Sequence, residues 1–261
     1  MTAILLTFTL LGFSDSPHAD AEALANAERD FAAGVNARND ADAARKHFAE
    51  AAREFDSLWN LGHHNPALAL NRTHAHRLAG NLPAAIAALH DGLAVARSDR
   101  NVQLELEDAR SAVLYPHRDL ETLCLPHPPG GIGTRMSPLE AFLAAGLLWL
   151  FACLGIARFA MTRVPAWLIA AAMALVSLAI LGEFWRQDWR RQVNDNLHPW
   201  AIVKSETSLK SGNGESWPDR LKWKLPAGVE VRELNNRGGW VQVELAGGAV
   251  GWLPATSLMT D

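Results

Sequence analysis

Apolar side chains along this chain are gathered into three runs, and the segments between the runs mix charged and apolar residues. The runs cover residues 3–13, 139–156 and 164–182. The second and third runs approach the roughly 20 residues that a membrane-spanning helix requires, and neither carries a charge in its interior. We therefore predict two transmembrane helices, at residues 139–158 and 164–182. The connection IARFAMTR is so short that the two helices must form an antiparallel hairpin.

The first apolar run is too short to cross about 30 Å of hydrocarbon, and polar residues follow it directly. This pattern is typical of the core of a secretory signal, so we predict that residues 1–14 are a signal peptide. An exported amino terminus and a two-helix hairpin place both soluble parts of the chain on the same side. We expect a protein of the inner (cytoplasmic) membrane with its soluble modules in the periplasmic, extracytoplasmic space.

The segment after the second span, residues 183–199, is predicted to form an interfacial helix and a linker. Trp185, Trp189 and Val193 recur at a spacing of four and lie beside arginines, which gives one apolar helical face next to positive charge. Such a face anchors a helix at the membrane surface. A binding site for anionic lipid head groups is an alternative that stays open.

Residues 20–118 are rich in alanine and have few Gly or Pro interruptions, which predicts helices joined by short turns. The segment GNLPAAIAALHDGL, residues 80–93, resembles the second half of a tetratricopeptide (TPR) unit, and residues 66–79 supply its first helix. A weaker copy, ERDFAAGVNAR followed by NDADAARKHFAEAAREF, precedes this unit. A further helix at residues 101–116 is expected to cover the open end as a solvating cap.

Matching positions in the two copies carry the residues that helix packing requires. Gly80 is expected at the turn, Ala85 and Leu89 at packing positions, and Gly92 where a small residue is needed. The offset between the copies is 41 residues, so the region around DSLWNLGHHN must accommodate an insertion. The corresponding positions of the first copy are Ala44, Phe48 and Ala51.

Stacked helical pairs form a concave surface that commonly binds a peptide. In this register the surface is lined by side chains from the first helix of each pair. The predicted protein-binding residues are Asn26, Arg29 and Asn36 in the first unit and Leu70, Asn71, His74 and Arg77 in the second. A merely solvated helical face is the alternative.

The sequence changes character in residues 200–261, where short segments of alternating residues are separated by turn residues. Gly238 and Gly239 are expected to make a hairpin turn. The strings GNG, LPAGVEV, RGGWVQVEL and GWLPATSL closely resemble the bacterial SH3 (SH3b) family over about sixty residues, which implies a small barrel. The side chains expected to alternate inward are Val229, Val231, Val241 and Val243.

Four tryptophans in this barrel segment are candidates for a ligand surface. Trp217 and Trp223 are predicted to line a groove for an extended peptide, as aromatic residues do in grooves that bind Pro-rich ligands. For Trp240 and Trp252 we favour packing in the barrel core.

Composition and motifs argue against several classes of function and site. The net charge of −4 gives no broad basic field for nucleic acid, and two cysteines exclude a disulfide framework. Cys124 with His117 and His127 could supply metal ligands, but they lie in or directly beside the Pro/Gly-rich linker predicted at 119–138, so a solvent-exposed linker is favoured. We find no catalytic motif, and we expect no enzyme activity, no cofactor and no metal site.

The order of these elements resembles a known family. A signal, TPR-like helices ending in LEDARSAVLYP, a two-helix hairpin and an SH3b barrel are similar to the BatE-like TPR/SH3 proteins of the Bat aerotolerance operons. This resemblance implies a multidomain membrane protein with all-α TPR-like repeats, an α-helical transmembrane hairpin and a small all-β SH3-like barrel. It also implies a non-enzymatic adaptor beside membrane proteins with von Willebrand factor A (VWA) domains and a MoxR-type ATPase.

A second function fits the same modules. The SH3b barrel would bind peptidoglycan stem peptides, and the helices would space it from the membrane. The chain would then be a cell-wall-sensing module and not an adaptor for protein partners.

Overall fold

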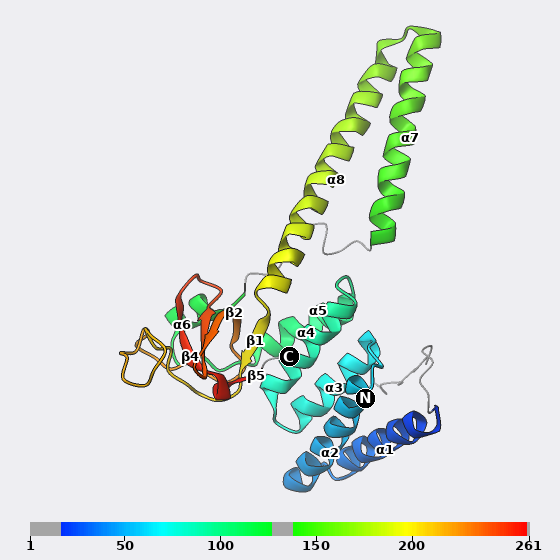
Figure 1. The fold of residues 1–261 in the computed structure, drawn as a ribbon. Helices are drawn as coiled ribbons and strands as arrows, with labels where there is room; N and C mark the ends of the chain where they lie inside the picture. Colours follow the sequence, from blue (N-terminus) through cyan, green and yellow to red (C-terminus); the bar gives the residue numbers. More distant parts are fainter. Residues whose placement is uncertain (1–16, 127–137, 260–261) are drawn as a thin grey trace. The chain divides into compact units, whose positions relative to one another are not determined.

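A computed structural model describes residues 17–126 and 138–259, so the predicted signal peptide at 1–14 lies outside the described residues. The chain divides into two compact units, residues 1–126 with 200–261 and residues 127–199 (Figure 1). The helices are α1 (Pro17–Asn36), α2 (Ala41–Asn60), α3 (Pro66–Leu78), α4 (Leu82–Val95), α5 (Arg100–Ser111), α6 (Arg118–Cys124), α7 (Pro138–Thr162) and α8 (Pro165–Leu197). The strands are β1 (Trp200–Val203), β2 (Glu230–Arg237), β3 (Trp240–Glu244), β4 (Val250–Pro254) and β5 (Leu258–Met259).

Helices α1 to α4 form two antiparallel pairs, and polar side chains fix where three of these helices begin. The carboxylate of Asp40 accepts hydrogen bonds from the first turn of α2, and the amide oxygens of Asn65 and Asn81 do so for α3 and α4. These side chains satisfy backbone N–H groups that have no partner within the helix. The chain turns sharply between α3 and α4 at Gly80, whose φ of +82° favours glycine.

The predicted packing positions of the two helix pairs are confirmed as buried. Ala85 and Leu89 are fully buried in α4. A Cβ atom at Gly92 would lie 2.7 Å from the Cβ of Ala69, so only glycine lets α3 and α4 approach this closely. The equivalent positions of α2, which are also buried, are Ala44, Phe48 and Ala51.

The helix expected at residues 101–116 as a cap is present as the shorter helix α5, whereas the linker expected at 119–138 is in part helical and buried. Helix α5 ends at Ser111, and Val113 just beyond it packs into a core shared with the barrel strands. The segment assigned to a linker contains α6, whose Leu120 and Cys124 are buried in the same core. These apolar side chains are buried against residues that are distant in the sequence, so the local sequence does not indicate their burial.

We keep the name barrel for the carboxyl-terminal segment that was predicted to form one; its residues 200–259 fold into one small antiparallel sheet with the strand order β4-β3-β2-β1-β5. The predicted hairpin turn is confirmed, since Gly238 and Gly239 have φ values of +61° and +78° between β2 and β3. The predicted inward valines are also buried. Residues 204–229, where strands were expected, form isolated bridges instead, such as Thr207 with Leu225 and Lys210 with Trp252. The buried valines are Val229, Val231, Val241 and Val243.

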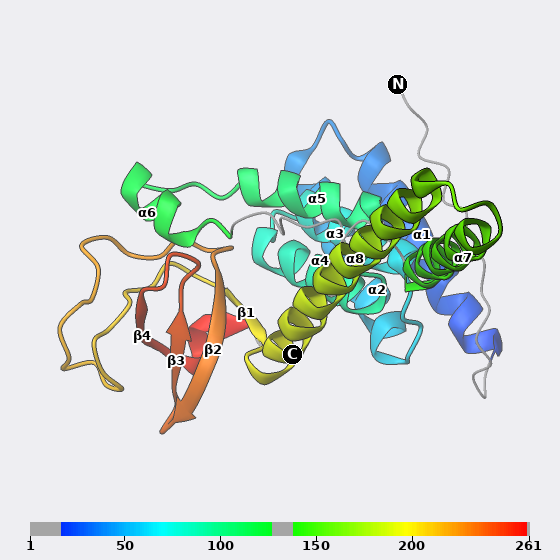
Figure 2. The same ribbon diagram turned by 90° about the horizontal axis from the view of Figure 1, so that it is seen from above.

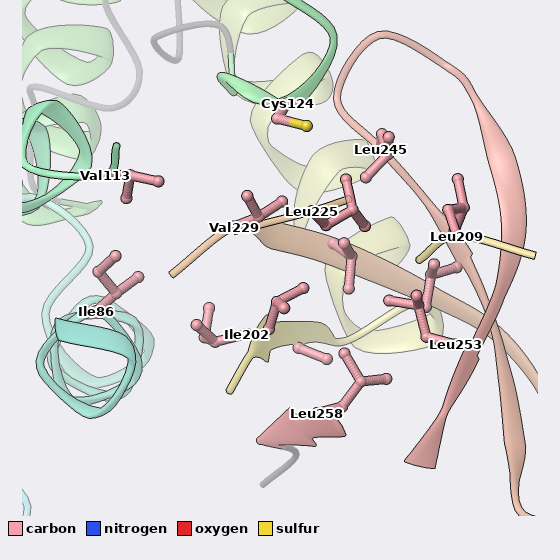
Figure 3. Close-up of a cluster of buried hydrophobic side chains, with 14 of the residues drawn as sticks. Ile86, Val113, Cys124, Ile202, Leu209, Leu225, Val229, Leu245, Leu253 and Leu258 are labelled. Atoms are coloured by element: carbon pink, nitrogen blue, oxygen red, sulfur yellow. The ribbon is translucent and has the colours of Figure 1, made fainter. Parts of the chain in front are cut away.

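One hydrophobic core joins the helices to the barrel (Figure 3). Ile86 of α4 and Val113 lie on one side of it, and Ile202 of β1 and Val229 lie opposite (Figure 3). A Cβ atom at Gly228 would lie 3.1 Å from Val113 and 3.4 Å from Ile86, which shows how closely the helices approach the barrel backbone. Helix α4 runs beside β1, and α6 lies on the barrel side of this unit (Figure 2).

Cys124 was expected in an exposed linker, and this expectation is wrong. Its side chain is fully buried in the shared core, close to the barrel (Figure 3). Burial raises the pKa of the Cys124 thiol to about 12. Because the thiolate is the reactive and metal-binding form, this cysteine is inert at neutral pH.

The second unit is a hairpin of the two long apolar helices α7 and α8. Residues Leu139–Thr162 and Pro165–Gln187 are each long and apolar enough to cross a membrane, with a mean hydropathy of 2.1. Only Arg163 and Val164 separate the helices, so the connection is shorter than the eight residues expected. Helix α8 also continues without a break through the predicted interfacial segment to Leu197.

Candidate protein-binding surfaces

The predicted groove residues of α3 meet acidic side chains of α5. His74 Nε2 lies 3.5 Å from Glu105 Oε1, and Arg77 Nη1 donates a 3.0 Å hydrogen bond to Glu105 Oε2. Arg77 Nη2 lies 2.7 Å from Asp108, whose side chain is 61% exposed. The structure thus brings His74 and Arg77 together at a charged, solvent-accessible seam between the first helix of one pair and α5.

The other predicted groove residues are more dispersed. In α1, Arg29 donates a 3.0 Å hydrogen bond to Asn26, while Asn36 is exposed at the end of the helix. In α3, Leu70 packs against the shared hydrophobic core and Asn71 is half-buried. Leu70 therefore has a structural contact that its predicted groove position did not indicate.

A second charged cluster lies between α2, α3 and α4. Arg72 Nε donates a 2.8 Å hydrogen bond to Asp56, and Arg72 Nη1 donates a 2.7 Å bond to Asp91. His76 Nε2 lies 3.0 Å from Asp56 Oδ2, and the Arg72 guanidinium lies over the Trp59 ring at 4.8 Å. Burial alone would raise the pKa of Asp56, but the hydrogen bonds and charges of His76 and Arg72 hold it below its usual value.

Sequence reasoning missed this cluster because its members are far apart in the chain. Arg72 is 16 residues from Asp56 and 19 from Asp91, and no short motif connects positions at such separations. The cluster fixes the three helices in register, and its side chains are largely unavailable to a ligand.

A third charged cluster joins the helices to the barrel. Glu230 of β2 accepts two hydrogen bonds from Arg110 of α5, at 2.6 and 2.7 Å, and lies 2.7 Å from His90 Nε2 of α4. The Glu230 side chain is only 1% exposed. Burial alone would raise its pKa, but the hydrogen bond from Arg110 and the charge of His90 lower it to about 2. The carboxylate is therefore ionised at neutral pH and satisfied by partners from two helices.

The two tryptophans predicted to bind a peptide have different surroundings. Trp217 is 51% exposed and lies against Gly212, where a Cβ atom would come within 2.4 Å of the indole. Trp223 stacks on His117, with ring centroids 4.4 Å apart and an interplanar angle of 11°. Trp217 is thus available at the surface, whereas Trp223 is held beside the start of α6.

Trp240 and Trp252 do not pack in the barrel core as predicted. Both are half-buried, and they alternate along β3 and β4 with the buried side chains of Val241 and Leu253. Since successive side chains of a strand point to opposite faces, the two tryptophans lie on the outer face of this hairpin. Backbone pairing sets Trp252 opposite Gln242, which shares that face.

The metal ligands considered from the sequence are not assembled by the structure. Cys124 is buried among apolar side chains, and His117 stacks on Trp223. His127 lies outside the described residues.

Comparison of the chain with protein-family models, with curated proteins and with solved structures gives no match.

Proposed function

We propose that the chain is a membrane-anchored, non-enzymatic adaptor that binds protein partners through its helical module and its barrel. The observation that supports this proposal most strongly is the shared core of these two parts. Ile86 and Val113 pack with Val229, and the buried carboxylate of Glu230 is held by Arg110 and His90. Helices and barrel therefore move as one body and offer a partner a single composite surface.

Two features of this body suit protein binding. The seam of His74, Arg77, Glu105 and Asp108 is charged and reachable, and its ion pairs are weak enough to be exchanged for a partner's charges. Trp217 adds an exposed aromatic side chain of the type that dominates binding energy in protein interfaces. The seam would confer specificity for the partner, and Trp217 would contribute binding affinity.

The compartment and the partners follow from the proposed topology. The two apolar helices Leu139–Thr162 and Pro165–Gln187 serve as a hairpin anchor in the inner membrane, with both soluble parts on the periplasmic side. The resemblance to Bat-type TPR/SH3 proteins makes VWA-domain membrane proteins and a MoxR-type ATPase complex the partners to test first. Because both soluble parts are proposed to lie on the periplasmic side, we expect them to contact the VWA domains directly.

The alternative proposal is a peptidoglycan-binding module, and one observation favours it. Trp240 and Trp252 lie on the outer face of the β3–β4 hairpin and not in the core. Aromatic side chains on an outer strand face can contact a ligand, whereas aromatic side chains in the core cannot. The ligand would then be a stem peptide of the cell wall.

Capture experiments on the detergent-solubilised full chain separate the two proposals. We expect VWA-domain proteins to copurify with the wild type and to be lost on Arg77→Glu, since charge reversal repels the acidic side chains that now hold Arg77. Arg53→Glu is the matched control, because Arg53 is an exposed arginine of α2 with one ion pair at 4.0 Å.

Binding to purified peptidoglycan is measured in parallel, with Trp252→Ala as the test variant. Retention on peptidoglycan that Trp252→Ala abolishes, together with no protein capture, would replace the adaptor proposal by the cell-wall proposal.

A further inference from the structure

Helices α1 and α2 bring together a histidine and two carboxylates. Asp30 projects from α1, and His47 and Glu50 project from α2. One donor atom from each lies within 4.8 Å of the other two. His47 and Glu50 are three positions apart and so share one face of α2.

The packing of α1 against α2 fixes the backbone positions of these three residues. Asp30 is followed by Phe31 and His47 by Phe48, and these two rings meet edge-to-face with centroids 5.2 Å apart. A Cβ atom at Gly34 would lie 2.7 Å from the Phe48 ring, so glycine permits a close approach of α1 to α2. The three polar side chains therefore flank a tight apolar contact that holds their backbones in place.

The imidazole of His47 carries an unsatisfied atom at this site. His47 Nδ1 is shielded from solvent, and within the part of the chain that the structure describes it has no hydrogen-bond partner. The nearest carboxylate oxygen, Oε2 of Glu50, is 3.7 Å away, which is too long for a hydrogen bond. A buried polar atom without a partner is costly, and an ion at the site is one of its ordinary explanations.

Among the side chains that the structure describes, Arg53 is the cation with a recorded ion pair to either carboxylate. Arg53 approaches Glu50 only at 4.0 Å, and its side chain is 74% exposed. An exposed pair of this kind contributes little. A cation among the three donors would satisfy Nδ1 of His47 and neutralise both carboxylates.

We propose that Asp30, His47 and Glu50 form a binding site for a divalent transition-metal ion, with Zn²⁺ as the best-suited ion. One imidazole nitrogen and two carboxylate oxygens are ligands that zinc accepts, whereas Ca²⁺ and Mg²⁺ prefer oxygen ligands alone. Bond lengths of about 2.1 Å place tetrahedral donors about 3.4 Å apart. The present separations, which reach up to 4.8 Å, would have to shorten to that value when the ion binds. Water completes the coordination, since three protein ligands leave a fourth position open.

The bound ion would cross-link α1 to α2. Both helices contribute ligands, so the ion binds only when the first helix pair is docked and thereby stabilises that docking. This role is independent of which partner the adaptor binds. The sequence alone predicted no metal site, because Asp30 becomes a neighbour of His47 and Glu50 only through the packing of α1 on α2.

The test is Zn²⁺ titration of the full chain, purified in detergent without a histidine tag and stripped of metal. We expect saturable binding of one Zn²⁺ per chain in the wild type. His47→Gln and Asp30→Asn should each weaken it more than roughly tenfold, because loss of groups that merely orient metal ligands already costs about 10–100-fold. Glu54→Gln, one turn further along α2, is the matched control and should bind as the wild type does.

Two measurements decide the result even if one variant folds poorly. Zn²⁺ should raise the thermal unfolding midpoint of the wild type and of Glu54→Gln, and it should leave that of His47→Gln unchanged. In addition, the ¹⁵N resonance of His47 Nδ1 should shift on Zn²⁺ addition. The proposal is overturned by the lack of saturable binding, or by binding that His47→Gln leaves intact, since the ion would then be held by other side chains.

Discussion

The three charged clusters that hold Arg77, Arg72 and Arg110 contain the same chemical groups but differ in how exposed their carboxylates are to water. The side chain of Glu230 is 1% exposed, those of Asp91 and Asp56 are 16% and 31% exposed, and that of Asp108 is 61% exposed. A carboxylate in water is solvated whether or not an arginine is present, whereas a buried one depends entirely on its partners. The junction between helices and barrel should therefore be the most sensitive, and the binding seam the most tolerant of substitution.

The sharpest test of this gradient is Arg110→Ala, which leaves Glu230 buried with the 2.7 Å contact to His90 Nε2 as its remaining side-chain partner among those described. Breaking a buried ion pair from one side costs about 3–5 kcal/mol. We expect a loss of that size in the free energy of unfolding, measured by denaturant titration of the full chain in detergent. Arg100→Ala, at the exposed start of the same helix, should change stability by less than about 0.5 kcal/mol.

The apolar pattern was enough to predict the helix pairs, the two apolar spans and the hairpin turn at Gly238 and Gly239. These features depend on residues close in sequence, such as Ala85 with Leu89. It was not enough to predict that α6 and Val113 join the barrel core, because that contact brings together residues more than a hundred positions apart. The exposure of Cys124 was wrong for the same reason. The Arg72 cluster and the neighbours of Asp30 likewise arise only from helix packing.

The stability that the junction between helices and barrel provides should also depend on pH, and the pKa of Glu230 gives the direction of this dependence. Its pKa in the folded chain is about 2, below the ordinary value of 4.5. The unfolded state thus binds more protons in this range, and the ionised carboxylate stabilises the fold above about pH 5. This contribution is lost as the pH falls through about 2.

We therefore expect stability to decrease by a few kcal/mol between pH 5 and pH 2. In Glu230→Gln the pH dependence in this window should be clearly shallower. Thermal unfolding by circular dichroism at a series of pH values measures both slopes. Parallel slopes for the two proteins would mean that other carboxylates dominate the acid response.

The cluster between α2, α3 and α4 should show an intermediate effect. Arg72→Ala removes hydrogen bonds to Asp56 and Asp91, and hydrogen bonds to charged groups are each worth about 1.5–3 kcal/mol. Both carboxylates retain some access to water, so a total loss of about 2–3 kcal/mol is expected. Denaturant unfolding measures it, and a loss as large as that of Arg110→Ala would show that carboxylate exposure does not set the order.

The binding seam should show the smallest effect on stability. In Arg77→Ala the ion pairs with Glu105 and Asp108 are lost, but the arginine is 31% exposed and Asp108 is 61% exposed. Exposed pairs contribute about 0.2–1 kcal/mol, and salt weakens them further. We expect a loss within that range in low salt and a smaller one in about 1 M NaCl, where the screening length falls to about 3 Å. Partner capture should fall in the same variant, because the seam loses a charge that a ligand would contact. A variant that lost several kcal/mol and all capture together would assign Arg77 to the fold. A stable variant that no longer captures its partner would assign it to binding, as its exposure predicts.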